Sequence, residues 1–291
     1  MGNFLVDVVL PLILAFIMFT LGLGLRPGDF MRVFLMPRAF ATGFVNQMVL
    51  LPIAGFALAH LIGLTPELAV GVMILVLCPG GVTTNVLAKI AGGNTALSIS
   101  LTAVVTVVVV FTMPLILYFS VRTFMGTEAP PVNTPILSIT MFLMTVVPVA
   151  IGMVVTALAP GGVAAAGTIL SRIAVALFAL IVLAAIAANL EVLRDNIVSL
   201  GPALFILMAL MLALGLVTAR LVGLASRDAT TIAIETGVQN ATLGIAVAAI
   251  LADQILVPGE GLSAFALPAA TYGILMYVLA IPFALWRRGC H

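Results

Sequence analysis

The chain has 291 residues, of which 64% are hydrophobic and only 7% are charged. Soluble domains carry about 25% charged residues, so this composition excludes a water-soluble fold and indicates an integral membrane protein in a lipid bilayer. The formal net charge of +1, with no run of basic residues, gives no basis for nucleic-acid binding.

Nine segments are apolar enough to cross a bilayer, which takes roughly 20 residues each as helices. The first opens the chain with MGNFLVDVVLPLILAF, which lacks the basic start of a signal peptide. The segments do not alternate apolar and polar residues as barrel strands do, so the predicted fold class is an all-α bundle. We expect spans at about 4–25, 38–62, 67–91, 96–119, 135–158, 169–190, 200–222, 228–252 and 262–286. Short connections such as RPGDFMR (26–32) and APGG (159–162) separate them.

Nine spans place the two termini on opposite sides of the membrane. With the N-terminus outside, the outer side holds only two basic residues, Arg122 and Arg194. The inner side then holds Arg26, Arg32, Arg38, Lys89, Arg172, Arg220, Arg227, Arg287 and Arg288. The positive-inside rule therefore predicts a multi-pass protein of the cell (inner) membrane with a cytoplasmic C-terminus.

Two spans contain segments that are too polar for lipid: CPGGVTTN at 78–85 and ETGVQN at 235–240. Proline removes a backbone donor and glycine weakens a helix, so we expect the third span to break at about 79–84. The eighth span is expected to break at about 236–240. Free backbone groups at membrane depth are tolerated only against protein or a wet cavity, so both breaks point to a site.

The two breaks fall in the penultimate spans of two blocks of helices, with the first block lacking its opening helix. This order predicts one transmembrane domain, 1–291, built from inverted repeats at about 1–120 and 135–291. Paired broken helices in inverted repeats are typical of the binding site of a secondary transporter.

The motifs PGGVTTN, GNTALSISLT (93–102) and ETGVQNATL (235–243) resemble those of the bile acid:sodium symporter family, and the similarity covers essentially the whole chain. The resemblance implies a bacterial nine-helix member, with a mobile panel of helices against a core in which two broken helices cross. It implies a symporter and no enzyme: two sodium ions drive a small organic anion inwards by alternating access. We expect the chain to function as a monomer.

Glu235 is the one ionisable side chain expected deep in a span, and acids there are mostly functional. The alternative is a protonated carboxyl group that hydrogen-bonds to a neighbouring helix. Sodium is a hard cation that binds oxygen ligands. The resemblance implies a first sodium site formed by Thr84, Asn85, Ser98, Thr102 and Glu235. Ser98 and Thr102 lie on one helix face, although such hydroxyls also bond the carbonyl one turn back.

The resemblance implies a second sodium site formed by Gln47, Glu235, Thr236, Val238 and Gln239. For Gln47 the alternative is a hydrogen bond between helices, which the neighbouring Asn46 could make instead. The candidates for substrate binding are Thr83, Asn240, Thr271 and Tyr277. No lysine or arginine lies deep within the spans, so helix N-termini and bound sodium would balance an anion. The expected substrate is a pantoate-, keto-acid- or bile-acid-like carboxylate.

Three alternatives remain open. A metalloid or other anion exporter of the same superfamily would use a reactive cysteine, for which Cys78 is the candidate. An intramembrane protease would need two membrane aspartates, and a polyprenyl-phosphate transferase would need acidic loop clusters, which the sequence does not offer. A pore or a receptor is also possible, but neither function explains why two spans are broken.

Overall fold

The computed structural model describes residues 8–126, 129–255 and 263–290, and within these ranges the regular structure is entirely helical. The elements are α1 (Leu10–Leu23), α2 (Pro27–Met31), η2 (Arg32–Phe34), α3 (Pro37–Val45), η3 (Asn46–Leu50), α4 (Leu51–Ile62), α5 (Pro66–Leu77), α6 (Val82–Ile90), α7 (Thr95–Phe124), α8 (Thr134–Met141), η4 (Phe142–Val146), α9 (Val147–Leu158), α10 (Pro160–Ala188), α11 (Leu190–Leu221), α12 (Ser226–Gly237), α13 (Ala241–Ile255), η5 (Ala264–Ala266) and α14 (Leu267–Arg288). By length and composition, the described residues contain seven candidate spans, and up to nine if each of two bent helix pairs counts as one span. The predicted all-α membrane fold is confirmed.

Several predicted boundaries are wrong. The expected connection at 26–32 forms α2 and the start of η2, and α10 begins at Pro160, inside the expected connection APGG. Proline is favoured at the first helical position because the amide hydrogen that it lacks would have no partner there. Helix α11 begins at Leu190 rather than near residue 200, so its charged first turns are helical. Polarity alone therefore did not mark where these helices begin.

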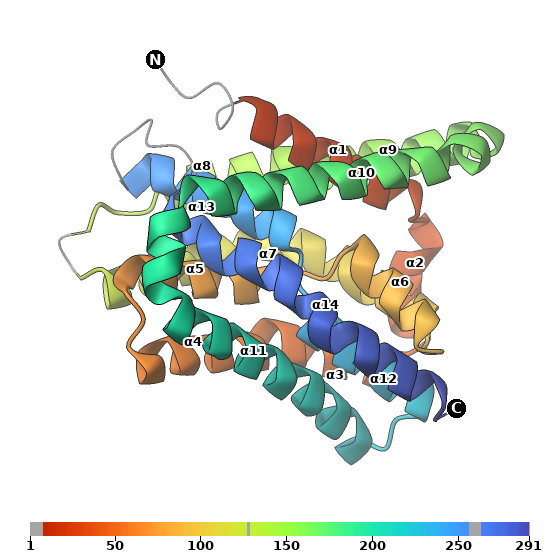
Figure 1. The fold of residues 1–291 in the computed structure, drawn as a ribbon. Helices are drawn as coiled ribbons and strands as arrows, with labels where there is room; N and C mark the ends of the chain where they lie inside the picture. Colours follow the sequence, from red (N-terminus) through yellow and green to blue (C-terminus); the bar gives the residue numbers. More distant parts are fainter. Residues whose placement is uncertain (1–7, 127–128, 256–262, 291) are drawn as a thin grey trace.

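The helices form two groups (Figure 1). In the first, α1 packs against α9 and α10, and α8 and η4 continue into α9; we call this group, α1 with α8 to α10, the panel. The remaining helices form the core. In an 18-residue apolar window of Ser226–Ile255, 94% of the residues are buried, against 22% in the corresponding window of Pro160–Ala188. The eighth span is therefore surrounded by protein, and α10 leaves most of its surface to lipid.

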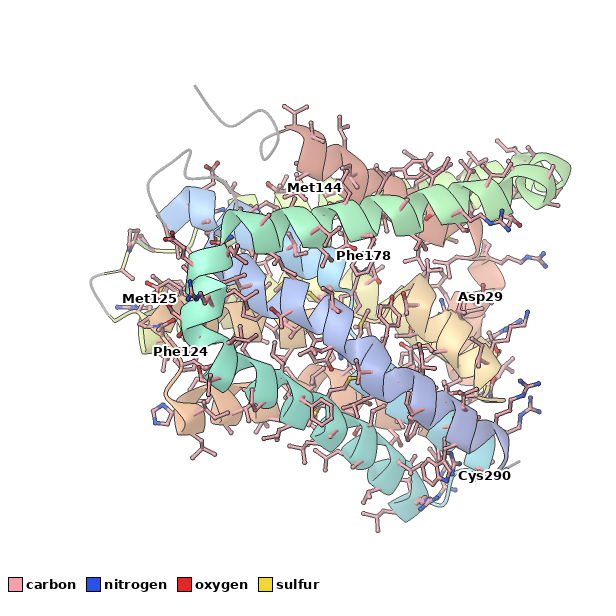
Figure 2. The ribbon with its side chains drawn as sticks, viewed as in Figure 1. Asp29, Phe124, Met125, Met144, Phe178 and Cys290 are labelled. Atoms are coloured by element: carbon pink, nitrogen blue, oxygen red, sulfur yellow. The ribbon has the colours of Figure 1, made fainter. Side chains whose placement is uncertain are left out.

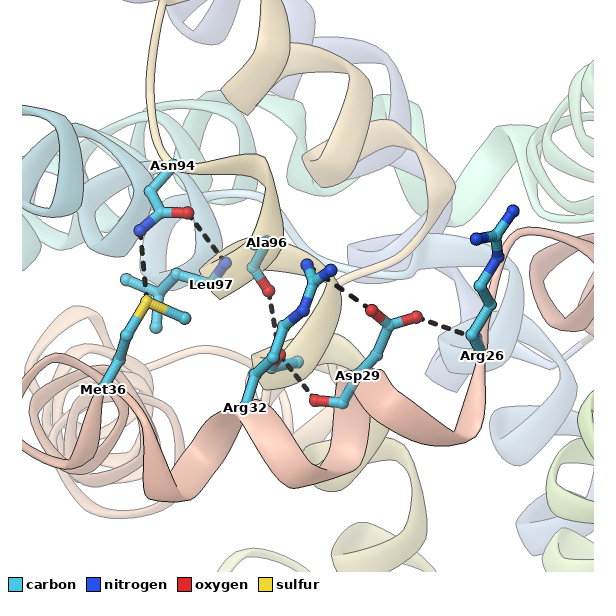
Figure 3. Close-up of polar contacts among 8 residues, drawn as sticks. Arg26, Asp29, Arg32, Met36, Asn94, Ala96 and Leu97 are labelled. Atoms are coloured by element: carbon cyan, nitrogen blue, oxygen red, sulfur yellow. Dashed lines mark hydrogen bonds and ion pairs between the residues drawn. The ribbon is translucent and has the colours of Figure 1, made fainter.

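A short elbow joins the panel helix α1 to the core. The chain turns by 77° between α1 and the segment Pro27–Phe34. Asp29 accepts a hydrogen bond from the backbone N–H of Arg26 at 2.7 Å and pairs with Arg32 at 3.5 Å (Figure 3). Ser100 of α7 donates to the backbone carbonyl of Asp29 at 2.7 Å. The elbow is therefore attached to the core, and the junction with the panel lies just before it.

Both predicted breaks are present, but each is shorter than expected. The first covers residues 78–81 between α5 and α6, which are bent by 61°, and the second covers 238–240 between α12 and α13. Thr84 accepts from the N–H of Gly81 at 3.2 Å and donates to its carbonyl at 2.8 Å, so α6 starts earlier than expected. Thr83 and Thr84 consequently lie in the first turn of α6, and Thr236 lies in the last turn of α12.

Two glycines bring α1 and α9 into backbone contact within the panel. A Cβ atom on Gly22 would lie 2.1 Å from the carbonyl oxygen of Val149, and one on Gly152 would lie 2.4 Å from that of Phe19. Small residues that let helix backbones approach closely are a principal way to join helices in lipid. These contacts hold α1 and α9 together as one unit.

We expect Gly22→Ala to destabilise the protein by about 1–3 kcal/mol, because the added methyl group must push α1 away from α9. The measurement is thermal unfolding of the purified protein in detergent. Gly161→Ala is the matched control, since a Cβ atom there meets nothing within 4 Å. Equal melting temperatures for the two variants would contradict this packing.

Candidate functional site

The two breaks cross and are joined through their backbones. The N–H of Asn240 donates to the carbonyl of Pro79 at 2.9 Å. A Cβ atom on Gly81 would lie 3.5 Å from the side-chain nitrogen of Asn240, so the two segments are in direct contact. The groups that the breaks free from helical hydrogen bonds therefore partly satisfy each other.

Glu235 lies in the last turns of α12 and turns its carboxylate towards α7. Its Oε1 accepts a hydrogen bond from the Ser98 hydroxyl. The Thr102 hydroxyl lies 3.1 Å from Oε2 and 3.4 Å from Oε1. Neither of these hydroxyls bonds a carbonyl of the described residues one turn back, whereas Ser100 and Thr106 on the same helix both do. The alternative of simple backbone bonding therefore does not hold for Ser98 and Thr102.

Two residues of α6 complete this cluster. Asn85 Oδ1 lies 2.8 Å from the Ser98 hydroxyl oxygen, and the hydroxyl oxygens of Thr84 and Thr102 are 3.4 Å apart. The structure thus brings together all five residues of the predicted first sodium site. Glu235, Thr84, Ser98 and Thr102 are each at most 3% exposed.

The cluster contains more acceptors than hydrogens. Six side-chain oxygens meet here with three hydroxyl hydrogens and the N–H of Gly81, and Thr84 donates its hydrogen to the carbonyl of Gly81. Ser98 has one hydrogen but two acceptors within reach, Asn85 and Glu235. Buried acceptors without donors are costly, and a cation that binds oxygen satisfies them. This set of oxygen ligands therefore fits a hard cation.

Gly80 leaves space among these oxygens. A Cβ atom on Gly80 would lie 2.5 Å from Glu235 Oε2, 2.8 Å from Thr84 Oγ1 and 3.1 Å from Thr102 Oγ1. Three oxygens from three helices therefore surround the position that a side chain would fill.

The residues of the predicted second sodium site lie together in part. Gln47 donates from Nε2 to the carbonyl of Cys78 at 2.8 Å and to Gln239 Oε1 at 2.9 Å, and Gln239 donates to the carbonyl of Thr236 at 2.9 Å. Gly237 and Val238 lie between Thr236 and Gln239, and Val238 is buried in the break itself. The side-chain hydrogen bonds of Glu235 within the described chain run to the first cluster and not to Gln47 or Gln239.

Gln47 owes its position to a π-helical turn. Residues Asn46–Leu50 form η3, directly before Pro52 near the start of α4. Such π-helical turns are frequent at functional sites. Gln47 is 3% exposed, and Asn46 donates to Thr218 at 2.8 Å. Asn46 thus makes one bond between helices, and Gln47 makes two more, to the Cys78 carbonyl and to Gln239, as the hydrogen-bonding alternative for Gln47 expects.

A cavity of about 260 Å³ lies beside the crossing, between the panel and the core. Core residues on its wall include Thr83, Asn240, Thr242, Met276 and Tyr277. The panel contributes Ile17, Met18, Thr20, Leu21, Ser171, Ala174, Val175 and Phe178. Phe178 points from α10 towards α14, where a Cβ atom on Gly273 would lie 3.2 Å from its ring (Figure 2).

Three of the four substrate candidates, Thr83, Asn240 and Tyr277, line this cavity, and Thr271 does not. The Thr271 hydroxyl is buried and has no partner among the described residues. Sequence reasoning missed Thr242, Ser171 and Phe178. Thr242 belongs to the motif ETGVQNAT and could have been found there, but the α10 residues sit in an ordinary apolar span that carries no signal.

The exporter alternative gains no support from the site, whereas the alternative for Glu235, a carboxyl group hydrogen-bonded to a neighbouring helix, shares the contacts to Ser98 and Thr102 of α7. The Cys78 thiol is fully buried, donates to the carbonyl of Ile74 and is not among the cavity-lining residues. The described residues contain no group of three or more His, Cys, Asp or Glu side chains that could hold a metal ion.

A sequence profile of the sodium bile acid symporter family matches residues 11–196, which is more than half of the chain. The chain belongs to this family. The match covers the first break and α7 but ends before Glu235.

Relatives from this family are transporters of bacteria, plants and animals. The chain is 31% identical over 243 residues to the uncharacterized sodium-dependent transporter YocS of Bacillus subtilis, with 82% of this chain and 73% of the relative covered. It is 34% identical over 240 residues to the ileal sodium/bile acid cotransporter of Oryctolagus cuniculus, with 81% of this chain and 67% of the relative covered. It is 29% identical over 235 residues to the probable sodium/metabolite cotransporter BASS1, chloroplastic, of Oryza sativa, with 81% of this chain and 57% of the relative covered. The chain spans little more than half the length of the rice relative.

We expect Gly80→Ala to weaken sodium binding at least tenfold, or about 1.4 kcal/mol, because the methyl group fills the space among the oxygens of Glu235, Thr84 and Thr102. Sodium-dependent thermal stabilisation, with choline replacing sodium, measures this. Gly81→Ala is the control, because its Cβ atom makes only ordinary contacts. An unchanged sodium response in Gly80→Ala would contradict a cation site at this position.

Proposed function

We propose that this member of the sodium bile acid symporter family is a secondary active symporter in which two sodium ions drive import of a small organic anion. The observation that carries the proposal is the buried carboxylate of Glu235 among an excess of oxygen acceptors. One ion would bind Thr84, Asn85, Ser98, Thr102 and Glu235. The second would bind Gln47, Gln239, Glu235 and the carbonyls of Thr236 and Val238, after the glutamine amides turn their oxygens inwards.

The cavity beside the crossing is suited to an anion although none of the described residues that line it is charged. The N-termini of α6 and α13 begin there, and helix N-termini favour negative charge. Thr83, Thr242 and the Nδ2 group of Asn240 offer hydrogen-bond donors that have no partner among the described residues. Thr242 is only 3% exposed, so its hydroxyl depends on a ligand or on water for a partner.

The volume of the cavity favours a small substrate. At about 260 Å³ it falls below the range of about 300–1,000 Å³ that is usual for drug-sized ligands. Its apolar side is formed by Ile17, Met18, Phe178 and Met276. A short carboxylate with a branched apolar body, such as a keto or hydroxy acid, matches this wall better than a bile acid does.

The central cavity is connected to further cavities on one side, which supports alternating access between the panel and the core. A second cavity, lined by Leu25, Asn85 and Gly167 among others, shares Thr20, Val82 and Ser171 with the first. A third continues to Arg172. If basic residues mark the cytoplasmic side, this path leads inwards, the N-terminus is outside and the conformation faces the cell interior. A cavity at the opposite end, lined by Leu10 and Asp253 among others, shares no lining residue with the central one.

The coupling is energetically sufficient. Two sodium ions moving down tenfold gradients release about 2.8 kcal/mol. One net positive charge crossing 100 mV adds about 2.3 kcal/mol. Together these sustain a substrate gradient on the order of a few thousand-fold. We propose that the chain functions as a monomer, and the two breaks are consistent with inverted repeats within one domain.

We expect Glu235→Gln to abolish sodium-stimulated uptake, because the amide removes the one charge that both ions would share. The substrate is first chosen from short carboxylates by thermal shift with and without sodium. A ligand that binds the folded protein raises its melting temperature, and a substrate coupled to sodium is expected to do so only when sodium is present. Uptake is then measured in proteoliposomes. Full sodium dependence in Glu235→Gln would refute the assignment, and Cys78→Ala, expected to transport normally, is the control.

We expect Thr242→Val to raise the KM for that carboxylate about tenfold, since a hydrogen bond to a charged group contributes about 1.5–3 kcal/mol. Valine preserves the shape of threonine and removes only the hydroxyl. Sodium binding without substrate is expected to stay unchanged, because Thr242 belongs to neither proposed ion site. If KM is unaltered, the substrate lies elsewhere.

A further inference from the structure

Tyr272 connects the last helix to the second break. It is 1% exposed and is the largest of the side chains that the fold buries almost completely. Its hydroxyl donates to the backbone carbonyl of Gly237, the last residue of α12. Since the helix ends there, this carbonyl has lost its helical partner, and Tyr272 supplies the replacement across from α14.

The direction of the Gly237 carbonyl determines where its neighbour points. Val238 has extended backbone angles, φ −116° and ψ 120°. In extended backbone the groups on the two sides of a residue point in opposite directions. With the Gly237 carbonyl held towards Tyr272, the Val238 carbonyl is directed away from α14.

Further contacts hold the break between α12 and α13 in place, on the α11 side and next to Tyr272 on α14. A Cβ atom on Gly237 would lie 2.7 Å from the Leu212 side chain of α11. A Cβ atom on Gly273, next to Tyr272, would lie 3.0 Å from Ala241 at the start of α13. The ends of α12 and α13 are therefore both packed, and the hydroxyl of Tyr272 holds the carbonyl of the last residue of α12.

From this geometry we infer that Tyr272 is a positioning residue for the second sodium ion: its hydrogen bond to Gly237 aims the Val238 carbonyl at the ion. Tyr272 touches neither sodium nor substrate. The inference rests on the proposed function, because it presumes that the Thr236–Gln239 segment binds sodium.

The test is a sodium titration of the purified, substrate-free protein at constant ionic strength, read by thermal stabilisation. The wild type is expected to respond with a Hill coefficient above one, as two coupled sites allow. Tyr272→Phe keeps the ring and removes the hydroxyl. It is expected to lower the apparent sodium affinity about tenfold and to bring the Hill coefficient to about one, because only the second site is impaired.

Tyr118→Phe is the matched control, since that hydroxyl accepts a hydrogen bond from Arg122 on α7, far along the chain from either break. A purely structural role for Tyr272 would lower the melting temperature without sodium and leave the sodium response unchanged; this result overturns the inference and spares the proposed function. A wild type without any sodium response overturns both.

If Tyr272→Phe protein is not recovered folded, 3-fluorotyrosine at position 272 replaces it. Fluorine makes the hydroxyl a stronger donor with little change of shape, so sodium affinity is expected to rise. Unchanged affinity overturns the inference.

Discussion

The hydrogen bond between the backbone of Asn240 and that of Pro79 is the contact on which the site depends. Unsatisfied backbone groups are costly in a membrane, so a broken helix persists only where its free groups find partners. Here two broken helices supply partners to each other. Side chains provide further partners: Gln47 donates to the Cys78 carbonyl, and Tyr272 donates to the Gly237 carbonyl.

This crossing also determines where the polar side chains lie. It brings α6 and α12 together next to α7, so that Thr84 and Ser98 meet Glu235 although they are far apart in the sequence. On the other side of the same crossing, the starts of α6 and α13 face the cavity. The oxygens proposed to bind cations and the donors proposed to bind an anion are thus neighbours, so that in the proposed symporter each bound charge stabilises the other. Such an arrangement links occupancy of one site to affinity at the other.

Much of this arrangement follows from the sequence. Nine apolar segments, and proline and glycine within a span, were enough to predict the helices and both breaks. The ends of helices were less predictable, because Thr84 starts α6 by bonding Gly81, a contact that no composition rule reveals. The panel wall of the cavity was missed since Phe178 and its neighbours are apolar residues in an apolar helix. Only the fold shows that they face the site.

The panel and the core are each held together by contacts of their own. Glycine contacts such as Gly22 against Val149 join the panel helices, and in the core glycine contacts such as Gly215 against Ala233 occur alongside hydrogen bonds between the breaks and the helices. The elbow is attached to the core by the hydrogen bond from Ser100 to the Asp29 carbonyl. Relative motion of the two groups therefore breaks no contact within the cluster of oxygens around Glu235.

The Asn240–Pro79 bond also has a consequence for biosynthesis. The carbonyl of Pro79 emerges from the ribosome long before its partner in the eighth span exists. Until then, the third span enters the membrane with free backbone groups in its middle, which water or the insertion machinery must shield. The chain therefore cannot complete its core span by span, and the second broken helix is needed to stabilise the first.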